Sequence, residues 1–450
     1  MSLIEPARIA QRSRAWPADQ PDAPTRSRAP ATTRAVATPA SGTTPGSIVR
    51  DLGRHTPSRG AAHDGCCRIV VARTTAELQP HIVAWEALAA NAIEPNVFLE
   101  PWQLLPAIEA FGAGKESLFL LVYRQSTERN TADLLIGLFA FERRNRLNGI
   151  PVRTLAAWTH PHLLLSTPLL HADHARPAWT ALIEWARAHH GEASILEFPL
   201  LLAEGPSHHA AIDVWREQHC TSLVIGHWTR ALLRRGRDAE SLISSALSSG
   251  VRKELRRQRR RLAEKGRLEV ARLTVDEVLL PWIDRFLTLE AAGWKGRAGT
   301  ALDRHANDQR YFQAICAAGH ERGQLDMLAL TLDGTPIAMK CNFTAGGTAF
   351  TLKIAHDEAY KSTSPGVLLE LENIAALHRQ SALDRMDSCA IPDHPMINRL
   401  WPDRREIAHV AICPGGWRGN MALAMFGLLR GVKRSVRRQA VPAKSKGEVK

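Results

Sequence analysis

The chain has 450 residues, of which 45% are hydrophobic and 23% are charged. This composition excludes wholesale disorder, and the length corresponds to about two or three domains. The longest apolar runs, such as residues 118–123, are far shorter than the roughly 20 residues of a transmembrane helix. No apolar segment follows Met1, so we expect neither a membrane span nor a secretory signal, and we expect a cytoplasmic protein.

The formal net charge is +13, and the positive charge is concentrated in three segments, residues 1–64, 251–265 and 430–450. They carry +4, +6 and +7, so the rest of the chain carries −4. A basic surface across a folded domain is therefore not required, which argues against DNA binding. An anionic membrane, a polyanionic substrate or RNA remains compatible with the segments themselves.

Cysteine and histidine spacing gives no indication of a metal site. The seven cysteines form no CxxC pair, which fits neither a disulfide framework nor a zinc ribbon, so we expect reduced thiols. His160 and His162 flank a proline, but their spacing matches no zinc pattern. We interpret them as ordinary loop histidines and expect no metal cofactor.

Composition divides the chain into four parts. Residues 1–64 are rich in Ala, Pro and Arg and nearly lack aromatic residues, which predicts a disordered arm. Residues 65–235 mix strands and helices and form the first predicted domain. Its clearest elements are strands at 68–73, 118–123, 134–141 and 194–198 and helices at 75–92 and 178–189.

The second predicted domain covers residues 236–418, and a basic amphipathic helix and tail cover 419–450. Three strands in close order, at 325–332, 335–343 and 348–355, are joined by Asp333-Gly334 and Gly346-Gly347, which are typical hairpin turns. Further strands are expected at 268–273, 385–389 and 405–412, and helices at 239–249, 251–265, 275–292, 304–322 and 366–378. The two domains share an order of elements, which suggests a duplicated α/β fold.

The most informative stretch is residues 360–369, YKSTSPGVLL, between a predicted strand and a predicted helix. Proline suits the first helical turn, where its missing N–H would be unpaired anyway. The free N–H groups and the helix dipole then form an anion site suited to a pyrophosphate. The same motif is also a common N-cap without a ligand. The expected phosphate-binding residues are Lys361, Ser364, Pro365, Gly366, Val367 and Leu368.

Four segments of the second half resemble the GNAT acyltransferase fold: RRQRRRLAEKG at 256–266, LEAAGWKGRAGTAL at 289–302, FTLKIAHD at 350–357 and YKSTSPGVLL at 360–369. In that fold, an antiparallel meander leads into a phosphate loop and a helix. More closely, residues 67–412 resemble the BioF2-like/CelD branch, associated with cellulose and exopolysaccharide biosynthesis. WTHPHLLLSTPLL at 158–170 is also typical of that branch.

The resemblance implies tandem GNAT-like domains, each a mixed, largely antiparallel sheet flanked by helices, with acyl-CoA as co-substrate. No second phosphate loop is found in the first domain, so we expect that domain to be degenerate and to shape the acceptor cleft. The chain departs from many relatives at residues 391–401, IPDHPMINRLW, where Asp393 remains but a Tyr-Lys pair is missing. This departure leaves the acceptor open.

The candidate catalytic residues are Asp357, Asp393 and His394. Asp357 follows the strand that leads into the phosphate loop, where it is either a base or a turn residue. Asp393 and His394 follow the last inner strand, and histidine has the right intrinsic pKa for a general base. The candidate acceptor-binding residues are Trp294, Lys295 and Arg399, each of which is also compatible with an ordinary structural or solvated role.

Two basic helices complete the picture. Residues 251–265 have one apolar seam, with Arg and Lys elsewhere, and fit either a solvated helix or a phosphate-binding surface. Residues 421–438 place Met421, Met425 and Leu428 on one face with basic residues beside them, which is typical of a peripheral membrane helix.

We therefore expect transfer of an acyl group from acyl-CoA to an amine or hydroxyl, with the resemblance implying a setting in surface polysaccharide or envelope synthesis. Two alternatives remain. The related Fem enzymes suggest aminoacyl transfer from charged tRNA, with residues 251–265 contacting RNA. A non-catalytic partner of an envelope synthase is the other.

Overall fold

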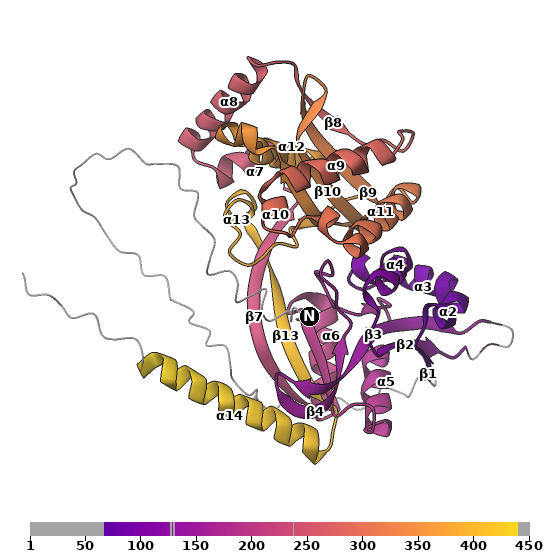
Figure 1. Cartoon of the computed structure of the whole chain (residues 1–450). Coiled ribbons are helices and arrows are strands. Elements are labelled where there is room, and N and C mark those ends of the chain that lie inside the picture. The colour runs from indigo at the N-terminus through magenta and orange to yellow at the C-terminus, as the bar shows by residue number, and fades with distance from the viewer. Residues whose placement is uncertain (1–66, 127, 129–130, 237, 440–450) are drawn as a thin grey trace, which may run out of the picture.

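The computed structural model describes residues 67–439, except 127, 129–130 and 237, and the side chains up to residue 430. The predicted disordered arm, residues 1–64, lies outside the described residues. The described chain forms one 13-stranded, mostly antiparallel sheet flanked by helices (Figure 1), which confirms the predicted α/β class. The strand order is β1-β2-β3-β4-β6-β13-β7-β12-β11-β10-β9-β8, with β5 paired to β3.

The first half of the described chain, up to Arg234, consists of strands and helices. Its strands are β1 (Cys67–Ala72), β2 (Ser117–Arg124), β3 (Leu134–Leu147), β4 (Ile150–Ala157), β5 (Leu169–Leu170), β6 (Ile195–Leu202) and β7 (Thr221–Arg234). Its α-helices are α2 (Thr75–Leu78), α3 (Ile82–Ala90), α4 (Pro101–Phe111), α5 (Ala175–Ala188) and α6 (Gly205–Glu217).

The second half has the same kinds of element. Its strands are β8 (Leu268–Arg272), β9 (Leu325–Leu332), β10 (Thr335–Ala345), β11 (Thr348–His356), β12 (Arg385–Asp387) and β13 (Asp403–Cys413). Its helices are α7 (Ala239–Ala246), α8 (Ser249–Ala263), α9 (Leu280–Ala292), α10 (Trp294–Arg297), α11 (Ala306–Glu321), the 3-10 helix η5 (Glu358–Thr363), α12 (Pro365–Arg379), α13 (Ile397–Leu400) and α14 (Trp417–Gln439).

The two halves repeat one pairing pattern. In the first, β1 to β4 pair antiparallel in sequence and β4 pairs parallel with β6. In the second, β8 to β11 pair antiparallel in sequence and β11 pairs parallel with β12. A helix, α5 or α12, connects each parallel pair. This order matches the expected duplication.

The halves exchange their last strands. β13, from the end of the second half, pairs with β6, while β7, from the end of the first half, pairs with β12. β7 and β13 also pair with each other along their length and run side by side between the halves (Figure 1). One sheet therefore runs through both halves. The predicted domain boundary near residue 235 is the point in the chain where the first half ends and the second begins, and it does not separate two independent sheets.

A shared hydrophobic core joins the halves beside the sheet. Trp102 of α4 packs on Phe343 of β10, with ring centroids 5.5 Å apart, and Phe98 packs on Phe350 of β11 at 5.8 Å. Gly319 of α11 allows the close approach, because a Cβ there would lie 3.2 Å from Trp102 and 3.1 Å from Phe343. The first half is therefore packed directly against the helices of the second.

Buried charges fix the centre of the sheet, where the exchanged strands meet β12. Asp387 of β12 has no solvent exposure and accepts hydrogen bonds from Arg230 of β7 at 2.7 Å and Arg405 of β13 at 2.8 Å. Glu94, from the first half, lies 3.4 Å from Arg385 and 3.7 Å from Arg405. Although burial alone would raise the pKa of the Asp387 carboxyl, the charges of Arg230 and Arg405 hold it below its ordinary value.

Prolines explain two differences from the sequence predictions. The helix predicted at 75–92 is interrupted by a 3-10 turn at Gln79–His81 that contains Pro80. The helix predicted at 275–292 begins only at Leu280, because Pro281 occupies its first turn. That helix ends at Ala292, as predicted, since Gly293 is extended, and Trp294 and Lys295 start the separate short helix α10.

Among the described residues, no helix combines the length and the apolar character needed to cross a bilayer.

We predict that Asp387→Asn strongly destabilises the protein, because Arg230 and Arg405 both lose the buried negative charge that they contact at hydrogen-bond distance. Removing one partner of a buried ion pair costs about 3–5 kcal/mol. Asp213→Asn is the matched control, because Asp213 pairs with Arg176 at an exposed site and such pairs contribute at most about 1 kcal/mol. Denaturant unfolding of both variants checks the prediction. Equal losses of stability in the two would contradict it.

Candidate active site

The parallel pairing of β11 with β12 covers only three residues of β11, Thr348 to Phe350. β11 continues to His356, paired with β10 on its other side. Within the described chain, no strand pairs with the outer edge of residues 351–356. Six residues of extended chain are about 20 Å long. This free edge offers backbone donors and acceptors to an extended ligand.

The corresponding gap in the first half is filled by the chain itself. The Leu200 N–H donates to the Ser166 hydroxyl at 3.0 Å, and the Leu202 N–H donates to the Thr167 hydroxyl at 2.9 Å. The Ser166 N–H donates in turn to the Leu200 carbonyl. Because residues 166–167 occupy the edge of β6, an extended ligand has no open strand there. This contrast supports the expectation that the first half lacks a donor site.

A bulge lies near the closed end of the gap. Thr351 faces Asn342 and Lys353 faces Cys341, so Leu352 is the extra residue of β11. Such a residue is left out of the regular ladder, and its backbone groups turn away from the neighbouring strand.

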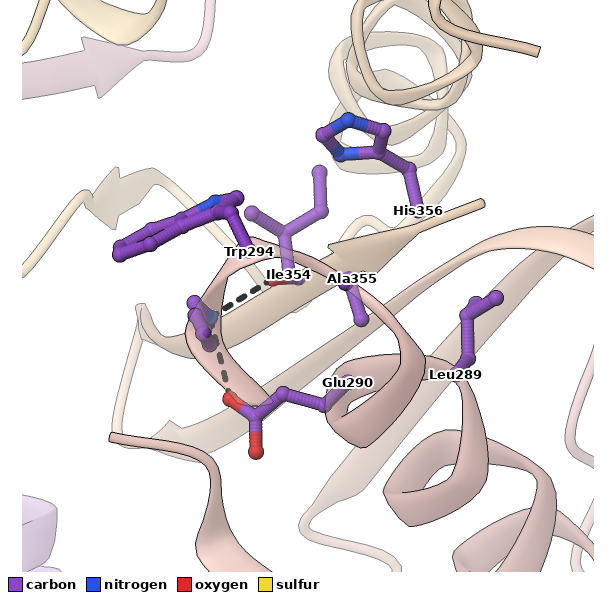
Figure 2. A pocket seen from close by; sticks show the side chains of 8 residues that line it. Leu289, Glu290, Trp294, Ile354, Ala355 and His356 are labelled. Atoms are coloured by element: carbon purple, nitrogen blue, oxygen red, sulfur yellow. Dashed lines mark hydrogen bonds and ion pairs between the residues drawn. The ribbon is translucent and has the colours of Figure 1, made fainter. Parts of the chain in front are cut away.

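A pocket opens along the free edge of β11, between this strand and the helices α9 and α10 (Figure 2). Figure 2 shows Ile354 and His356 on one side of the strand and Ala355 on the other. The lining residues are Leu289, Glu290, Gly293, Trp294, Lys295, Ile354, Ala355 and His356.

Two lysines share one buried carboxylate beside this pocket. The Glu290 side chain is 1% exposed and lies 3.1 Å from Lys295 Nζ and 3.2 Å from Lys353 Nζ. Burial favours the protonated acid, but the two lysines outweigh it and lower the pKa of Glu290. Burial, with the charge of Lys353, also lowers the pKa of Lys295. The cluster therefore holds two positive charges against one negative charge.

Lys295 reaches the edge of the strand itself. Its ammonium donates to the Ile354 carbonyl at 2.9 Å as well as to Glu290, which uses two of its three N–H groups. The predicted cation is thus at the site, but it is held in place by protein partners. Trp294 is on the same helix, lines the same pocket and is 38% exposed.

The predicted phosphate loop connects β11 to α12, as the sequence pattern indicates. Ser364 adopts a left-handed backbone, with φ 49° and ψ 52°, and Pro365 starts α12. A Cβ added to Gly366 would meet nothing closer than 3.6 Å, at Nδ1 of His356. The fold itself therefore does not require glycine at this position. Lys361 is exposed, and Pro365, Gly366 and Leu368 are buried.

His356, which the sequence analysis did not select, lies at the open end of the gap beside Gly366. Burial, together with the charge of Lys295, lowers its pKa, so the ring is neutral at pH 7. The only sequence signal for it is its position as the last residue of the strand before the loop. Asp357, the next residue, accepts the Ala359 N–H at 2.9 Å and so acts as the cap of η5.

The predicted acceptor residues lie on one loop after β12. Asp393 and Arg399 are exposed, and within the described chain their side chains make no ion pair. His394 is half-buried, its Nδ1 accepts the Ile397 N–H at 3.3 Å, and burial lowers its pKa. Because Nδ1 accepts, the neutral ring carries its proton on Nε2.

The charges of a second buried pair, Lys340 and Glu370, act on the His394 ring in opposite directions. Lys340 of β10 and Glu370 of α12 lie 2.6 Å apart and are almost fully buried. Glu370 also accepts from the Trp401 indole N–H at 3.0 Å. These contacts attach α12 to the meander and so position the phosphate loop. Neither residue was predicted from the sequence, since their roles depend on partners far away in the chain.

The histidines near residue 160 form an interface between the halves. The His162 ring lies 3.0 Å from Asp308 of α11, and His160 stacks on Phe111 of α4 at 5.0 Å. Nε2 of His160 is buried with no hydrogen-bond partner in the described structure. In the same part of the chain, no three His, Cys, Asp or Glu side chains are grouped to bind a metal ion.

A comparison with known protein families finds a match for one part of the chain. The sequence model of the acetyltransferase (GNAT) domain matches residues 249–394. This span runs from α8 to His394 and includes the meander, the free edge of β11 and the phosphate loop. This part of the chain is therefore similar to GNAT-type acetyltransferase domains. No curated protein matches the sequence.

Solved structures show distant similarity over most of the chain. A crystal structure of FemX is 11% identical, with 76% of this chain and 96% of that chain covered and a TM-score of 0.48. The C-terminal domain of a putative lysylphosphatidylglycerol synthetase from Agrobacterium fabrum is 12% identical, with coverages of 78% and 96% and a TM-score of 0.44. A tandem GNAT protein from the clavulanic acid biosynthesis pathway is 13% identical, with coverages of 78% and 100% and a TM-score of 0.39.

We predict that His160→Phe makes the protein less sensitive to acid. Burial holds the pKa of His160 well below its ordinary value. Below about pH 6.5 the unfolded chain therefore binds a proton that the folded chain does not, and stability falls with falling pH. At pH 5.5, one pH unit below the ordinary pKa of histidine, this effect is on the order of 1 kcal/mol.

Thermal unfolding at pH 7.5 and pH 5.5 measures the effect. Phenylalanine keeps the ring stacking without the unpaired N–H, so the fall in Tm between the two pH values should shrink. His190→Phe, at an exposed position after α5, is the control and should keep the fall seen in the wild type. An unchanged fall in His160→Phe would refute the prediction.

Proposed function

We propose that the chain transfers an acyl group from acyl-CoA to an amine or hydroxyl acceptor, in the second half of the molecule. The observation that carries the proposal is the unpaired edge of residues 351–356, which leads to the start of α12. An extended pantetheine arm, which contains two amides, can pair with such an edge as an added strand does. Its phosphates then lie at the helix N-terminus, where the helix dipole and the Gly366 N–H attract anions, whereas the Val367 and Leu368 N–H groups already donate to the Ser364 carbonyl.

The direction of the gap places the reacting thioester. If the phosphates lie at Gly366, the arm runs past His356 and Ile354 toward the bulge at Leu352. The thioester then lies at the closed end, where the Leu352 N–H is a candidate to polarise the carbonyl. His356 is placed at the phosphate end, too far from the reacting carbon to act as the base.

Proton transfer is assigned to the loop after β12. With its proton on Nε2, the neutral ring of His394 can donate a hydrogen bond to the departing thiolate. Exposed Asp393 is the candidate to accept the proton of the acceptor and to pass it on to the thiolate. The positive cluster of Lys295 and Lys353 stabilises a thiolate or an anionic group of the acceptor. Arg399 is a further candidate for the acceptor side. Asp357 caps η5 and is given no catalytic role.

The biological setting follows only from the resemblance to the BioF2-like/CelD branch, which implies surface polysaccharide or envelope synthesis. Aminoacyl transfer from charged tRNA is the alternative favoured by basic α8. A non-catalytic binding role is the third. It requires that function survive simultaneous substitution of Gly366 and Asp393.

We predict that Gly366→Ala and Gly366→Glu separate folding from donor binding. Alanine fits the space and favours a helix over glycine by up to about 1 kcal/mol, so the Tm without ligand should be equal or higher. Acetyl-CoA at about 100 times its Kd should stabilise the wild type by roughly 2.7 kcal/mol. This stabilisation should decrease in Gly366→Ala and disappear in Gly366→Glu, where a carboxylate faces the phosphates.

Thermal shift with acetyl-CoA, longer acyl-CoAs and free CoA measures these effects. His394→Gln is the matched variant outside the phosphate loop, and it should keep the full thermal shift while losing turnover. A wild type that shifts with none of these ligands would contradict acyl-CoA dependence. Equal shifts in all four proteins would place the donor elsewhere.

We also propose that α14 contacts an anionic membrane. Ala422 and Leu423 are buried against the sheet, whereas the opposite face of the helix exposes apolar side chains. These are Trp417, Met421, Met425, Leu428 and Leu429. The sequence has no acidic residue between Glu406 and Glu448 but eight Lys and Arg. An exposed apolar stripe with cations beside it is typical of interfacial helices.

Sedimentation with vesicles containing phosphatidylglycerol checks this proposal. Trp417→Ser/Met425→Ser/Leu428→Ser should reduce the bound fraction several-fold, because the helix loses the apolar area that enters the interface. The matched control is Val83→Ser/Val275→Ser/Val278→Ser, which removes three exposed apolar side chains elsewhere. Wild-type binding by the α14 variant would argue against the contact.

A further inference from the structure

Helix α8 presents two different faces. Leu255 and Leu262 are buried and attach the helix to the second half. Seven of the fifteen residues from Ser249 to Ala263 are Arg or Lys, and one is acidic. Since residues 3, 4 and 7 apart share a face, most of these cations fall on the side away from Leu255. α8 therefore carries a strongly basic outer face on a conventionally packed helix.

The inner flanks of α8 fix it beside the phosphate loop. Arg259 pairs with Glu372 of α12 at 2.6 Å. Lys265, just after the helix, lies 5.5 Å from the ring centroid of Tyr360, and α8 contacts η5 directly. η5 leads into Ser364 and the N-terminus of α12, so the basic face borders the entrance of the candidate donor site.

Three cations of the outer face form no ion pair with any residue that the structure describes. Lys253, Arg256 and Arg261 are exposed, and within the described chain none of them makes an ion pair or a side-chain hydrogen bond. Arg257 and Arg260 pair with Glu254 and Glu264 at the surface. A donor that lies along the free edge of β11 would contact the predicted phosphate loop and Lys265. The outer face of α8 points away from such a donor. A partner that covers α8 from outside can pair with these charges.

We propose that α8 is the docking surface for an acidic carrier protein that delivers the acyl group on a phosphopantetheine arm. This inference rests on the proposed acyl transfer. In such a donor, one phosphate joins the arm to the protein, so the protein surface must lie next to the phosphate site. α8 has this position. α8 is about 22 Å long, so a negatively charged helix of the partner can lie along it. Charge complementarity of this kind guides docking.

Other partners fit this surface less well. None of the exposed large apolar side chains of the described chain belongs to α8, so it lacks what an interfacial membrane helix inserts. Figure 1 also shows α8 and α14 at opposite ends of the molecule, so a flat membrane at α14 does not reach α8. RNA would need charge over a larger area, whereas the chain outside the three basic segments is net negative.

Binding of a fluorescently labelled acyl carrier protein, charged with acetyl-phosphopantetheine, tests the inference by anisotropy. The test variant is Lys253→Gln/Arg256→Gln/Arg261→Gln in the full chain. The control, Arg146→Gln/Arg216→Gln/Arg285→Gln, removes three other exposed arginines that form no ion pair in the described chain. Acetyl-CoA binding is measured in parallel by thermal shift, and bulk tRNA serves as a competitor.

We expect the test variant to bind the carrier at least about tenfold more weakly, and the wild-type affinity to fall with salt. Acetyl-CoA binding should stay within about twofold in both variants, because the outer face does not contact the arm. The control should bind the carrier like the wild type.

Four results would overturn the inference. The first is a wild type that binds acetyl-CoA but not the carrier. The second is a test variant that keeps full affinity for the carrier. The third is an equal loss of affinity for acetyl-CoA and for the carrier in the test variant, which would make α8 part of a CoA site. The fourth is displacement of the carrier by bulk tRNA at a lower concentration than by unlabelled carrier, with tRNA binding that depends on the same three cations. This result would favour RNA as the partner. If the wild type binds neither acetyl donor, the proposed acyl transfer itself fails.

Discussion

The early end of the parallel pairing between β11 and β12 is the constraint on which the rest of the site depends. Strands that separate after Phe350 leave six residues of β11 with one edge that no strand of the described chain pairs, in the interior of the strand order. The connecting helix α12 must then begin beside that edge. The open hydrogen-bonding edge and the positive helix end are thus two results of one geometric event.

Buried charges keep this opening in place on both sides. Lys340 and Glu370 attach α12 to the meander, and Asp387 ties β12 to the exchanged strands β7 and β13. Charge pairs in such dry surroundings add little net stability, but their geometry is exacting and any mismatch is costly. They therefore define how the elements are placed more than how strongly they are held. At the corresponding place in the first half, Ser166 and Thr167 fill the edge of β6.

Local patterns in the sequence were enough for the meander, its two hairpin turns and the loop at residues 360–369, because each depends on neighbours in the chain. The exchange of β7 and β13 was not predicted, since it pairs residues nearly 200 positions apart through backbone groups that every residue has. Pairs such as Glu290 with Lys353 escaped for the same reason. Asp357 shows the opposite error, because a residue at a suggestive position serves as a cap.

The strand exchange has a consequence for the order in which the protein is built. As the chain emerges from the ribosome, the first half is complete at Arg234, but the strand that belongs between β6 and β7 is Asp403–Cys413. Until then, β6 and β7 have no common neighbour and expose open edges, which are prone to wrong pairing. The first half can therefore reach its final sheet only after about 170 further residues have been translated, and loop closure over this distance slows folding. In this protein, the two repeated halves mature together.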